Sequence, residues 1–257
     1  MLQSQDQKRD SQHKAKLKAS EHHEHSPEAI AKRLKAGPSL SYLRDWVYGG
    51  IDGAVTTFAV VSGVIGAQLS TRTILILGIA NVLADGFSMA AANYLGTKTE
   101  RDQRGHYKNI EERHIDIYPE GEKEEVRQIL KKKGFDGELL EKGTEKLTSD
   151  RKRWIDTMLT EEYGIAPNIR SPMRASMSTF TSFLFCGFIP LVPFVFGLPQ
   201  AFRWAGAFTA IVFFSIGSLK SRWSPISWWV SGLQTLVIGS AAASIAYFAG
   251  ILLRSIG

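Results

Sequence analysis

Residues 226–253 read ISWWVSGLQTLVIGSAAASIAYFAGILL, and this run carries no formal charge. A helix that crosses a bilayer needs roughly 20 predominantly apolar residues, because the hydrocarbon core is about 30 Å thick. The run meets that requirement. It therefore predicts a membrane-spanning helix near the carboxyl end of the chain.

Four other segments have a similar composition. They are residues 47–67, 74–95, 175–197 and 204–219. The first contains a single charge, Asp52, and the second contains only Asp85. The last is short, and it spans the membrane if Arg203 lies at the head-group level with its charge in water. The sequence thus predicts an all-α integral membrane protein with five transmembrane helices.

Charged residues are concentrated in two polar segments. The first is rich in Lys, Gln, Ser, Glu and His, a composition typical of a flexible tail. The second contains seventeen acidic and seventeen basic residues and lies between the second and third spans. The predicted order is a tail over residues 1–40, transmembrane helices 1–2 over 41–95, an insert over 96–174 and transmembrane helices 3–5 over 175–257.

Basic residues predict the orientation. Nine Lys and Arg residues precede the first span, seventeen lie in the insert and two lie between the fourth and fifth spans. Only Arg72, Arg203 and Arg254 fall on the other side. By the positive-inside rule the amino terminus and the insert are cytoplasmic. No signal peptide is visible. Short loops favour a bacterial inner membrane over a vacuolar one.

The net charge of +6 requires no nucleic-acid partner, because the insert is neutral and the excess charge lies where anionic lipid would meet it.

The insert contains sequence signals for the ends of three helices. One run extends to about Asp116 and breaks at Tyr118-Pro119. A second begins at Gly121 and ends near Gly134, and a third covers about residues 150–163. Three short helices can bury one another, so we expect a three-helix cytoplasmic insert.

Small residues and prolines predict how the spans pack. Glycines lie three or four residues apart in the first span, and the last span contains a run of small residues over 239–244. The glycines of the first span are Gly49, Gly53, Gly63 and Gly66. Small residues allow close approach of transmembrane backbones, so we expect both spans at helix contacts. Pro190 and Pro193 predict a kink in the third span.

Two carboxylates lie within the predicted spans. An ionisable residue near mid-membrane costs about 2.5–3.5 kcal/mol on insertion scales and is a functional candidate by default. Asp85 lies four residues after Asn81 and four before Met89, so these three side chains share one helix face. The alternative is that Asp52 anchors its helix at the head groups and Asp85 makes a structural hydrogen bond between helices.

The insert contains candidate metal ligands at helical spacing. The pairs are Glu111 with His114, Glu122 with Glu125, and Met158 with Glu162. Each pair is three or four residues apart and can share a helix face. Carboxylate and imidazole together suit Fe(II), Mn(II) or Zn(II), whereas copper would draw on several sulfur ligands. The alternative for these acids is an ordinary solvated helix face.

The first two spans carry two specific motifs. The first is YGGIDGAVTTFA over residues 48–59, and the second is GIANVLADGFSMA over 78–90. A third stretch, IPLVP, covers residues 189–193. With these motifs the sequence resembles the vacuolar iron transporter family over roughly residues 42–253.

The resemblance implies an architecture and an activity. Family members are homodimers with five transmembrane helices and a cytoplasmic three-helix metal-binding insert. The implied activity is the uptake of Fe(II), often also Mn(II), from the cytosol in exchange for protons. Divalent ions, protons, the bilayer and a second copy of the chain are then the expected partners. The metal is cargo, and no permanent cofactor is expected.

The resemblance also assigns residues. Asp52 and Met89 match the carboxylate and methionine of the family's translocation path at the dimer interface. Five positions in the insert match metal-holding residues, and a sixth residue, Glu100, heads the helix that follows the second span. The five are Glu111, Glu122, Glu125, Met158 and Glu162.

Three positions depart from the family pattern. Asn81 stands where plant members have glutamate, and Asp85, one turn away, is a possible substitute. His114 replaces a glutamate, and Leu159 follows Met158 where some members have a second methionine. The last two changes bear on metal selectivity.

Two other functions remain open. One is a membrane-tethered di-iron ferroxidase, since Glu111 and His114 form a Glu-x-x-His pattern. Such sites require two of these patterns and the sequence has one, so we expect a transporter rather than an enzyme. The other is a membrane-bound metal sensor or metal-binding protein without transport. Asp52 and Asp85 argue against it, because a sensor has no need for acids in two spans.

Overall fold

The computed structural model describes residues 26–36, 40–167 and 169–254, and within these ranges all regular structure is helical. The chain divides into two units, Met1–Leu40 and Ser41–Gly257. In the first unit, Pro27–Ala36 forms helix α2. The rest of the predicted tail, apart from Ser26 and Leu40, lies outside the described residues.

Among its described residues, the second unit contains five helices that are long and apolar enough to cross a membrane, which confirms the predicted number of spans. They are α3 (Leu43–Gly66), α4 (Thr71–Ile117), the segment Pro172–Val195, α10 (Ala201–Lys220) and α11 (Trp228–Arg254). The middle segment changes helix type at its prolines. It consists of α8 (Pro172–Phe188), a 3₁₀ turn (Ile189–Leu191) and α9 (Val192–Val195). This interruption agrees with the predicted kink.

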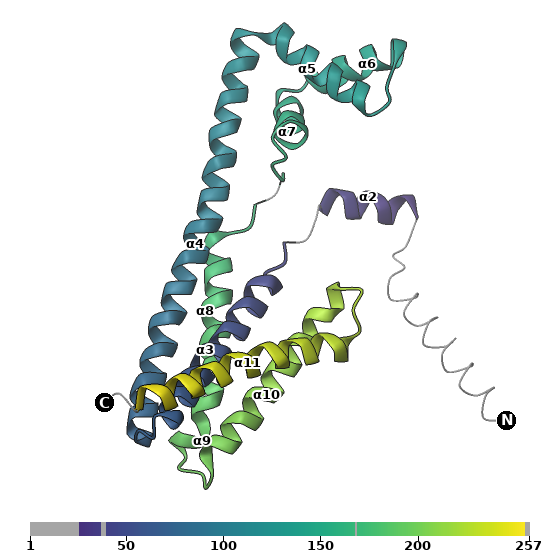
Figure 1. Cartoon of the computed structure of the whole chain (residues 1–257). Coiled ribbons are helices and arrows are strands. Elements are labelled where there is room, and N and C mark those ends of the chain that lie inside the picture. Colours follow the sequence, from purple (N-terminus) through teal and green to yellow (C-terminus); the bar gives the residue numbers. More distant parts are fainter. Residues whose placement is uncertain (1–25, 37–39, 168, 255–257) are drawn as a thin grey trace, which may run out of the picture. The chain divides into compact units, whose positions relative to one another are not determined.

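Helix α4 is a single helix of 47 residues, about 70 Å long at about 1.5 Å per residue. It begins at Ser70, whose hydroxyl accepts a hydrogen bond from the backbone N–H of Thr73. It continues out of the membrane-spanning segment to the insert helices (Figure 1). Glu100 therefore lies within this helix, and the prediction that it heads a separate helix is wrong. The helix ends at Tyr118 because Pro119 cannot continue it.

The insert contains α5 (Pro119–Lys132), α6 (Gly137–Thr148) and α7 (Arg151–Glu161), packed against the end of α4. Its apolar core includes Val126, Trp154, Met158 and Leu159. Helix α6 was not predicted from the sequence. The stop near Gly134 is confirmed, since this glycine has a φ of +91°, which other residues rarely adopt.

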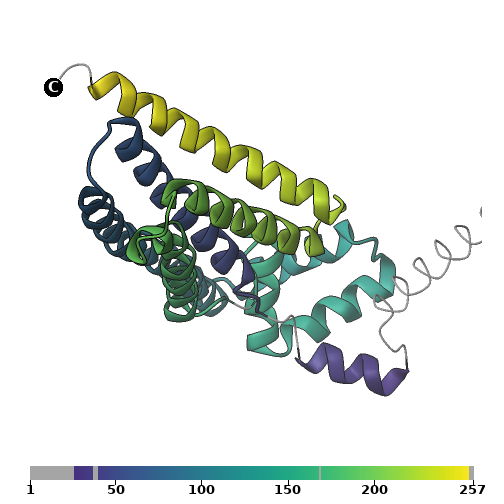
Figure 2. The same cartoon turned by 90° about the horizontal axis from the view of Figure 1, so that it is seen from below.

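Helix α3 packs against α4, α8, α10 and α11. Two of its glycines meet the α8 backbone: a Cβ at Gly49 would clash with the carbonyl of Thr179, and one at Gly53 with the carbonyl of Phe183. Gly63 and Gly250 approach each other in the same way where α3 meets α11. These contacts confirm the prediction from the glycine spacing. The other face of α11 is exposed along the outside of the bundle (Figure 2).

We expect Gly53→Ala to lower the free energy of unfolding by about 1–3 kcal/mol, because the added methyl group has no space against the α8 backbone. The matched control is Gly96→Ala in α4, where the new Cβ has no atom of a neighbouring element within 4 Å. The control should stabilise the protein by about 0.5–1 kcal/mol. Thermal unfolding in detergent measures both, and equal melting temperatures for the two variants would contradict the packing.

Candidate metal centre

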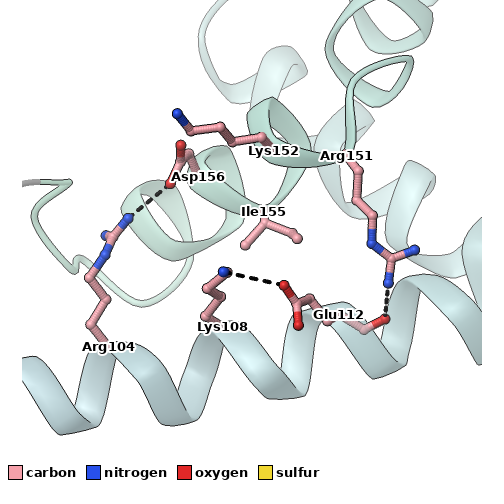
Figure 3. Close-up of a pocket in the computed structure, with 7 residues that line it drawn as sticks. All are labelled: Arg104, Lys108, Glu112, Arg151, Lys152, Ile155 and Asp156. Carbon is pink, nitrogen blue, oxygen red and sulfur yellow. Dashed lines mark hydrogen bonds and ion pairs between the residues drawn. The ribbon is translucent and has the colours of Figure 1, made fainter.

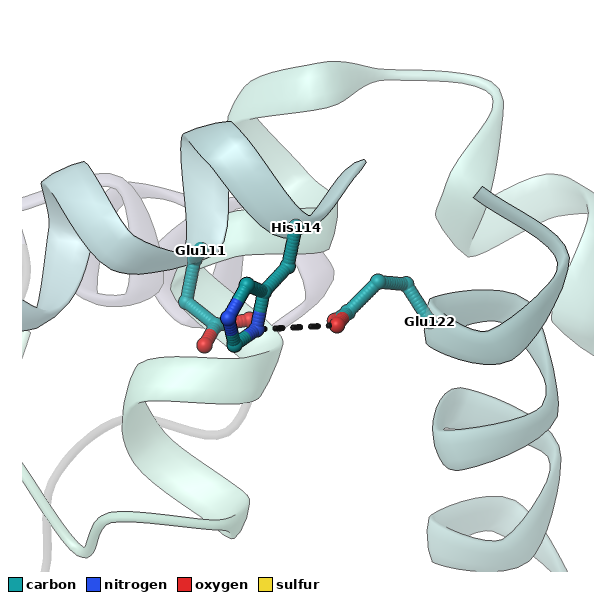
Figure 4. Close-up of side chains that lie close together, drawn as sticks. All are labelled: Glu111, His114 and Glu122. Carbon is teal, nitrogen blue, oxygen red and sulfur yellow. Dashed lines mark ion pairs between the residues drawn. The ribbon is translucent and has the colours of Figure 1, made fainter. Parts of the chain in front are cut away.

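The turn between α4 and α5 brings three candidate ligands together. Glu111 and His114 lie on the last turns of α4, and Glu122 lies in the first turn of α5 after the chain reverses at Pro119. Their ligand atoms all lie within 4.8 Å of one another. Figure 4 shows the three side chains pointing toward the same space from the two helices. A divalent cation can bind in such a space.

Contacts with His114 and Tyr163 orient the carboxylates of Glu122 and Glu111, but each contact uses only one of the two oxygens. Nδ1 of His114 lies 3.2 Å from Oε1 of Glu122, and the hydroxyl of Tyr163 donates to Oε1 of Glu111 at 2.9 Å. Glu111 is 1% exposed and Glu122 is 5% exposed. The second oxygen of each carboxylate is buried without a hydrogen-bond partner. Because buried polar atoms are normally paired, these two oxygens favour a bound cation.

Burial and mutual repulsion raise the pKa of two carboxyl groups in this cluster. Burial, followed by the negative charges of Glu111 and Glu125, raises the pKa of Glu122 to about 8. Burial and the charges of Glu125 and Glu111 also raise the pKa of Glu162. These interactions place Glu125 and Glu162 in the electrostatic environment of the three ligands. A metal ion would stabilise all four carboxylates in their charged form.

An ion pair and a hydrogen bond join α7 to α4 beside this cluster. A groove of about 580 Å³ lies between the two helices (Figure 3). Arg104 donates to Asp156 at 2.8 Å, and Arg151 donates to the backbone oxygen of Glu112 at 2.8 Å. These contacts hold α7 in place, and the residues that follow it include Tyr163.

Other expected ligands are placed differently. Met158 is fully buried in the apolar core of the insert, and its role as a ligand stays a prediction. Glu100 is exposed on α4, about 16 Å along the helix from Glu111, and the structure does not bring it to the cluster. Tyr163 was missed by the sequence analysis. Its position directly after Glu162, at the end of a predicted helix, was the available signal.

The acids of the membrane bundle lie on α3 and α4. Asp52 is partly buried and lines a pocket of about 670 Å³ whose walls are mostly apolar. The side chain of Asn81 donates to Thr56 Oγ1 at 3.4 Å, and Thr56 donates to the backbone oxygen of Asp52 at 2.9 Å. Asp85 is exposed one helical turn beyond Asn81 on α4. The two carboxylates therefore share one region of the bundle.

Met89 lies one turn beyond Asp85 on α4 and is partly buried. Its sulfur is a soft ligand type, in contrast to the two nearby carboxylates.

Comparison with known proteins identifies the family. A model described as the VIT family matches residues 43–251, which include the first four spans, the insert and α11 as far as Ile251. The chain belongs to the VIT family. It is 31% identical to a vacuolar iron transporter of Toxoplasma gondii over 87% of this chain and 78% of that protein. Vacuolar iron transporter 1 of Arabidopsis thaliana is also 31% identical, over 80% of this chain and 83% of the relative.

In rice, vacuolar iron transporter 2 is 31% identical over 86% of this chain and 89% of that protein. The VIT family match confirms the resemblance seen in the motifs around Asp52 and Asp85. The matched range contains both the acidic cluster of the insert and the acids of the membrane bundle.

Because burial and neighbouring negative charges raise the pKa of Glu122, we expect metal binding at this cluster to depend on pH. The folded, metal-free cluster keeps this proton up to about pH 8, whereas the unfolded chain loses it near the ordinary pKa of 4.5. The stability of the metal-free insert should therefore fall as the pH rises from 4.5 to about 8. Metal binding displaces the proton, so the affinity for Mn(II) should rise up to about tenfold per pH unit and level off above about pH 8.

Calorimetric titration between about pH 6 and 9 measures this dependence. The variant Glu122→Gln, which has no proton to release at this position, should show a flatter curve. Equal slopes for the two proteins would contradict the assignment of the proton to Glu122.

Proposed function

We propose that this protein moves divalent iron, and manganese with it, out of the cytosol across a membrane in exchange for protons. The observation that carries the proposal is the presence, in one chain, of an acidic cluster in the insert and of carboxylates on two of the five membrane-spanning helices. Relatives at 31% identity are named as iron transporters, which supports the same cargo here. The metal is the substrate, and we propose no permanent cofactor.

The ligand types support Fe(II) and Mn(II). Glu111 and Glu122 offer oxygen and His114 offers nitrogen, a set that suits these ions. Glu125 and Glu162 add negative charge close by. Such a cluster raises the local concentration of divalent cations before the membrane step. In this proposal the insert collects the ion and Asp52 receives it.

Proton exchange follows from the chemistry of a carboxylate. Asp52 can hold a cation or a proton, and the two compete for the same oxygens. Protonation from the acidic side releases the metal, and loss of that proton on the cytosolic side restores the site. Asp85, one helical turn beyond Asn81 on α4, is the candidate for a second proton site.

Exposure in the membrane bundle supports a homodimer. Asp85 is exposed on α4, and Tyr48 is 67% exposed on α3. A carboxylate that faces lipid at mid-membrane costs about 2.5–3.5 kcal/mol. A second copy that covers this face would remove that cost, and the path containing Asp52 and Met89 would then lie between the copies. The basic residues of the tail and the insert support a cytoplasmic location for both.

Uptake by proteoliposomes tests the function against its two alternatives. Vesicles with the protein and an acidic interior should accumulate Fe(II) and Mn(II), read by quenching of an internal dye. Metal binding without uptake under any gradient would favour a sensor. Oxidation of Fe(II) without uptake would favour a ferroxidase, although the described residues contain only one cluster of three candidate ligands.

A further inference from the structure

A buried ion pair joins the insert to the membrane bundle. Asp45 lies in the first turn of α3 and is only 5% exposed. Arg170 lies in the segment that returns from α7 to α8, and its Nη1 lies 2.7 and 3.0 Å from the two carboxylate oxygens of Asp45. The pair connects residues that are 125 positions apart in the sequence.

Asn93 extends this pair to α4 and α8. Its side-chain nitrogen lies 3.1 Å from Oδ1 of Asp45, 3.2 Å from the backbone oxygen of Ala175 and 2.7 Å from Oγ1 of Thr179. Its side-chain oxygen accepts a hydrogen bond from Thr97 at 3.3 Å. A buried charge pair is tolerated when further hydrogen bonds satisfy it, as they do here. We name Asp45, Asn93, Thr97, Arg170 and Thr179 the junction network.

The junction network lies between the acidic cluster of the insert and the proposed translocation path, which contains Asp52 and Met89. Along α3, Asp45 precedes Asp52 by two helical turns, about 10 Å. Along α4, Asn93 follows Met89 by one turn. Arg170 follows Glu162 of the acidic cluster by eight residues. The network therefore contacts both helices that carry path residues and the chain that leaves the insert.

We propose that Asp45, Asn93 and Arg170 are positioning residues for transport. The network sets α3 against α4 and so sets the separation of Asp52 from Met89, and Arg170 ties this separation to the insert. Loss of Arg170 leaves the charge of Asp45 buried without its partner and frees the first turn of α3 to shift. This inference rests on the proposed transport function.

The test measures metal binding and transport separately in the full-length protein. The variants are Arg170→Gln, the conservative Arg170→Lys, and the double variant Asp45→Asn with Arg170→Gln, which removes both charges and leaves none unpaired. The matched control is Arg174→Gln, an exposed arginine four residues further on. Titration calorimetry gives the affinity of the insert for Mn(II). Initial uptake rates in proteoliposomes give kcat and KM.

If these residues position the transport path, kcat should fall while the affinity for Mn(II) and KM stay nearly unchanged. Arg170→Gln and the double variant should lower kcat by about tenfold or more, because small misplacements at a site are costly, with Mn(II) affinity and KM within about twofold of the wild type. Arg170→Lys should recover part of kcat, and Arg174→Gln should match the wild type.

Two outcomes overturn the proposal. One is wild-type kcat in the double variant, which would show that the Asp45–Arg170 pair only stabilises the fold. The other is a parallel loss of Mn(II) affinity and kcat in both Arg170→Gln and the double variant, which indicates general unfolding. An inactive wild type in the same vesicles would instead refute the transport function, and the positioning role with it.

Discussion

Asp52→Asn is expected to reduce metal uptake by about 100-fold or more. Asparagine keeps the shape of the side chain but can carry neither the negative charge nor the exchanged proton. A charge-assisted contact contributes up to about 3 kcal/mol, and every 1.4 kcal/mol is a factor of ten. Initial rates of Mn(II) uptake in proteoliposomes measure the loss.

The control for this substitution is Asp102→Asn, which removes an exposed carboxylate of α4 near Glu100 and should leave uptake unchanged. The Mn(II) affinity of the insert should also stay unchanged in Asp52→Asn, because the acidic cluster does not include Asp52. Uptake at the wild-type rate by Asp52→Asn would rule out this aspartate as part of the path.

The second large effect is expected at the acidic cluster. Glu111→Gln removes a buried ligand whose neighbours are His114 and Glu122. The affinity of the insert for Mn(II) should fall by about 100-fold, by the same conversion of contact energy. The KM for uptake should rise, whereas kcat should stay close to that of the wild type, since the cluster collects the ion and does not form the path. Calorimetry and saturation kinetics measure the two quantities.

Glu120→Gln is the matched control for Glu111→Gln. It changes an exposed glutamate on α5, two residues before Glu122 and paired only with Lys123 in the contacts that the structure gives. This control should bind Mn(II) with wild-type affinity. Similar losses in Glu111→Gln and Glu120→Gln would show a diffuse electrostatic effect instead of a defined site.

The five spans could be predicted because each requires a long apolar run, which hydropathy detects directly. The continuity of α4 could not be predicted in this way. The sequence changes from apolar to charged near Gly96, and this change marks the edge of the membrane instead of the end of a helix. The residues between Leu95 and Tyr118 contain no proline. Helix α6 was missed because it buries only Leu140 and Thr144 among its residues, too few to give a clear apolar period.

Part of the candidate site follows from local spacing. Glu111 and His114 share a face of α4 because they are three residues apart, and the proline after Tyr118 predicts the turn that precedes Glu122. The contact of Tyr163 with Glu111 and the Asp45–Arg170 pair join residues 52 and 125 positions apart. Such contacts depend on how the chain returns to the bundle, which no periodicity in a single sequence shows.

The exchange of metal for protons is tested most directly by measuring both in the same vesicles. Proteoliposomes with an acidic interior would carry a metal-quenched dye and a pH-sensitive dye. We predict that added Fe(II) or Mn(II) enters the vesicles and that their interior becomes more alkaline at the same time. Both signals should be lost in Asp52→Asn. Metal uptake without any change in internal pH would contradict the exchange, and no uptake in any gradient would contradict transport itself.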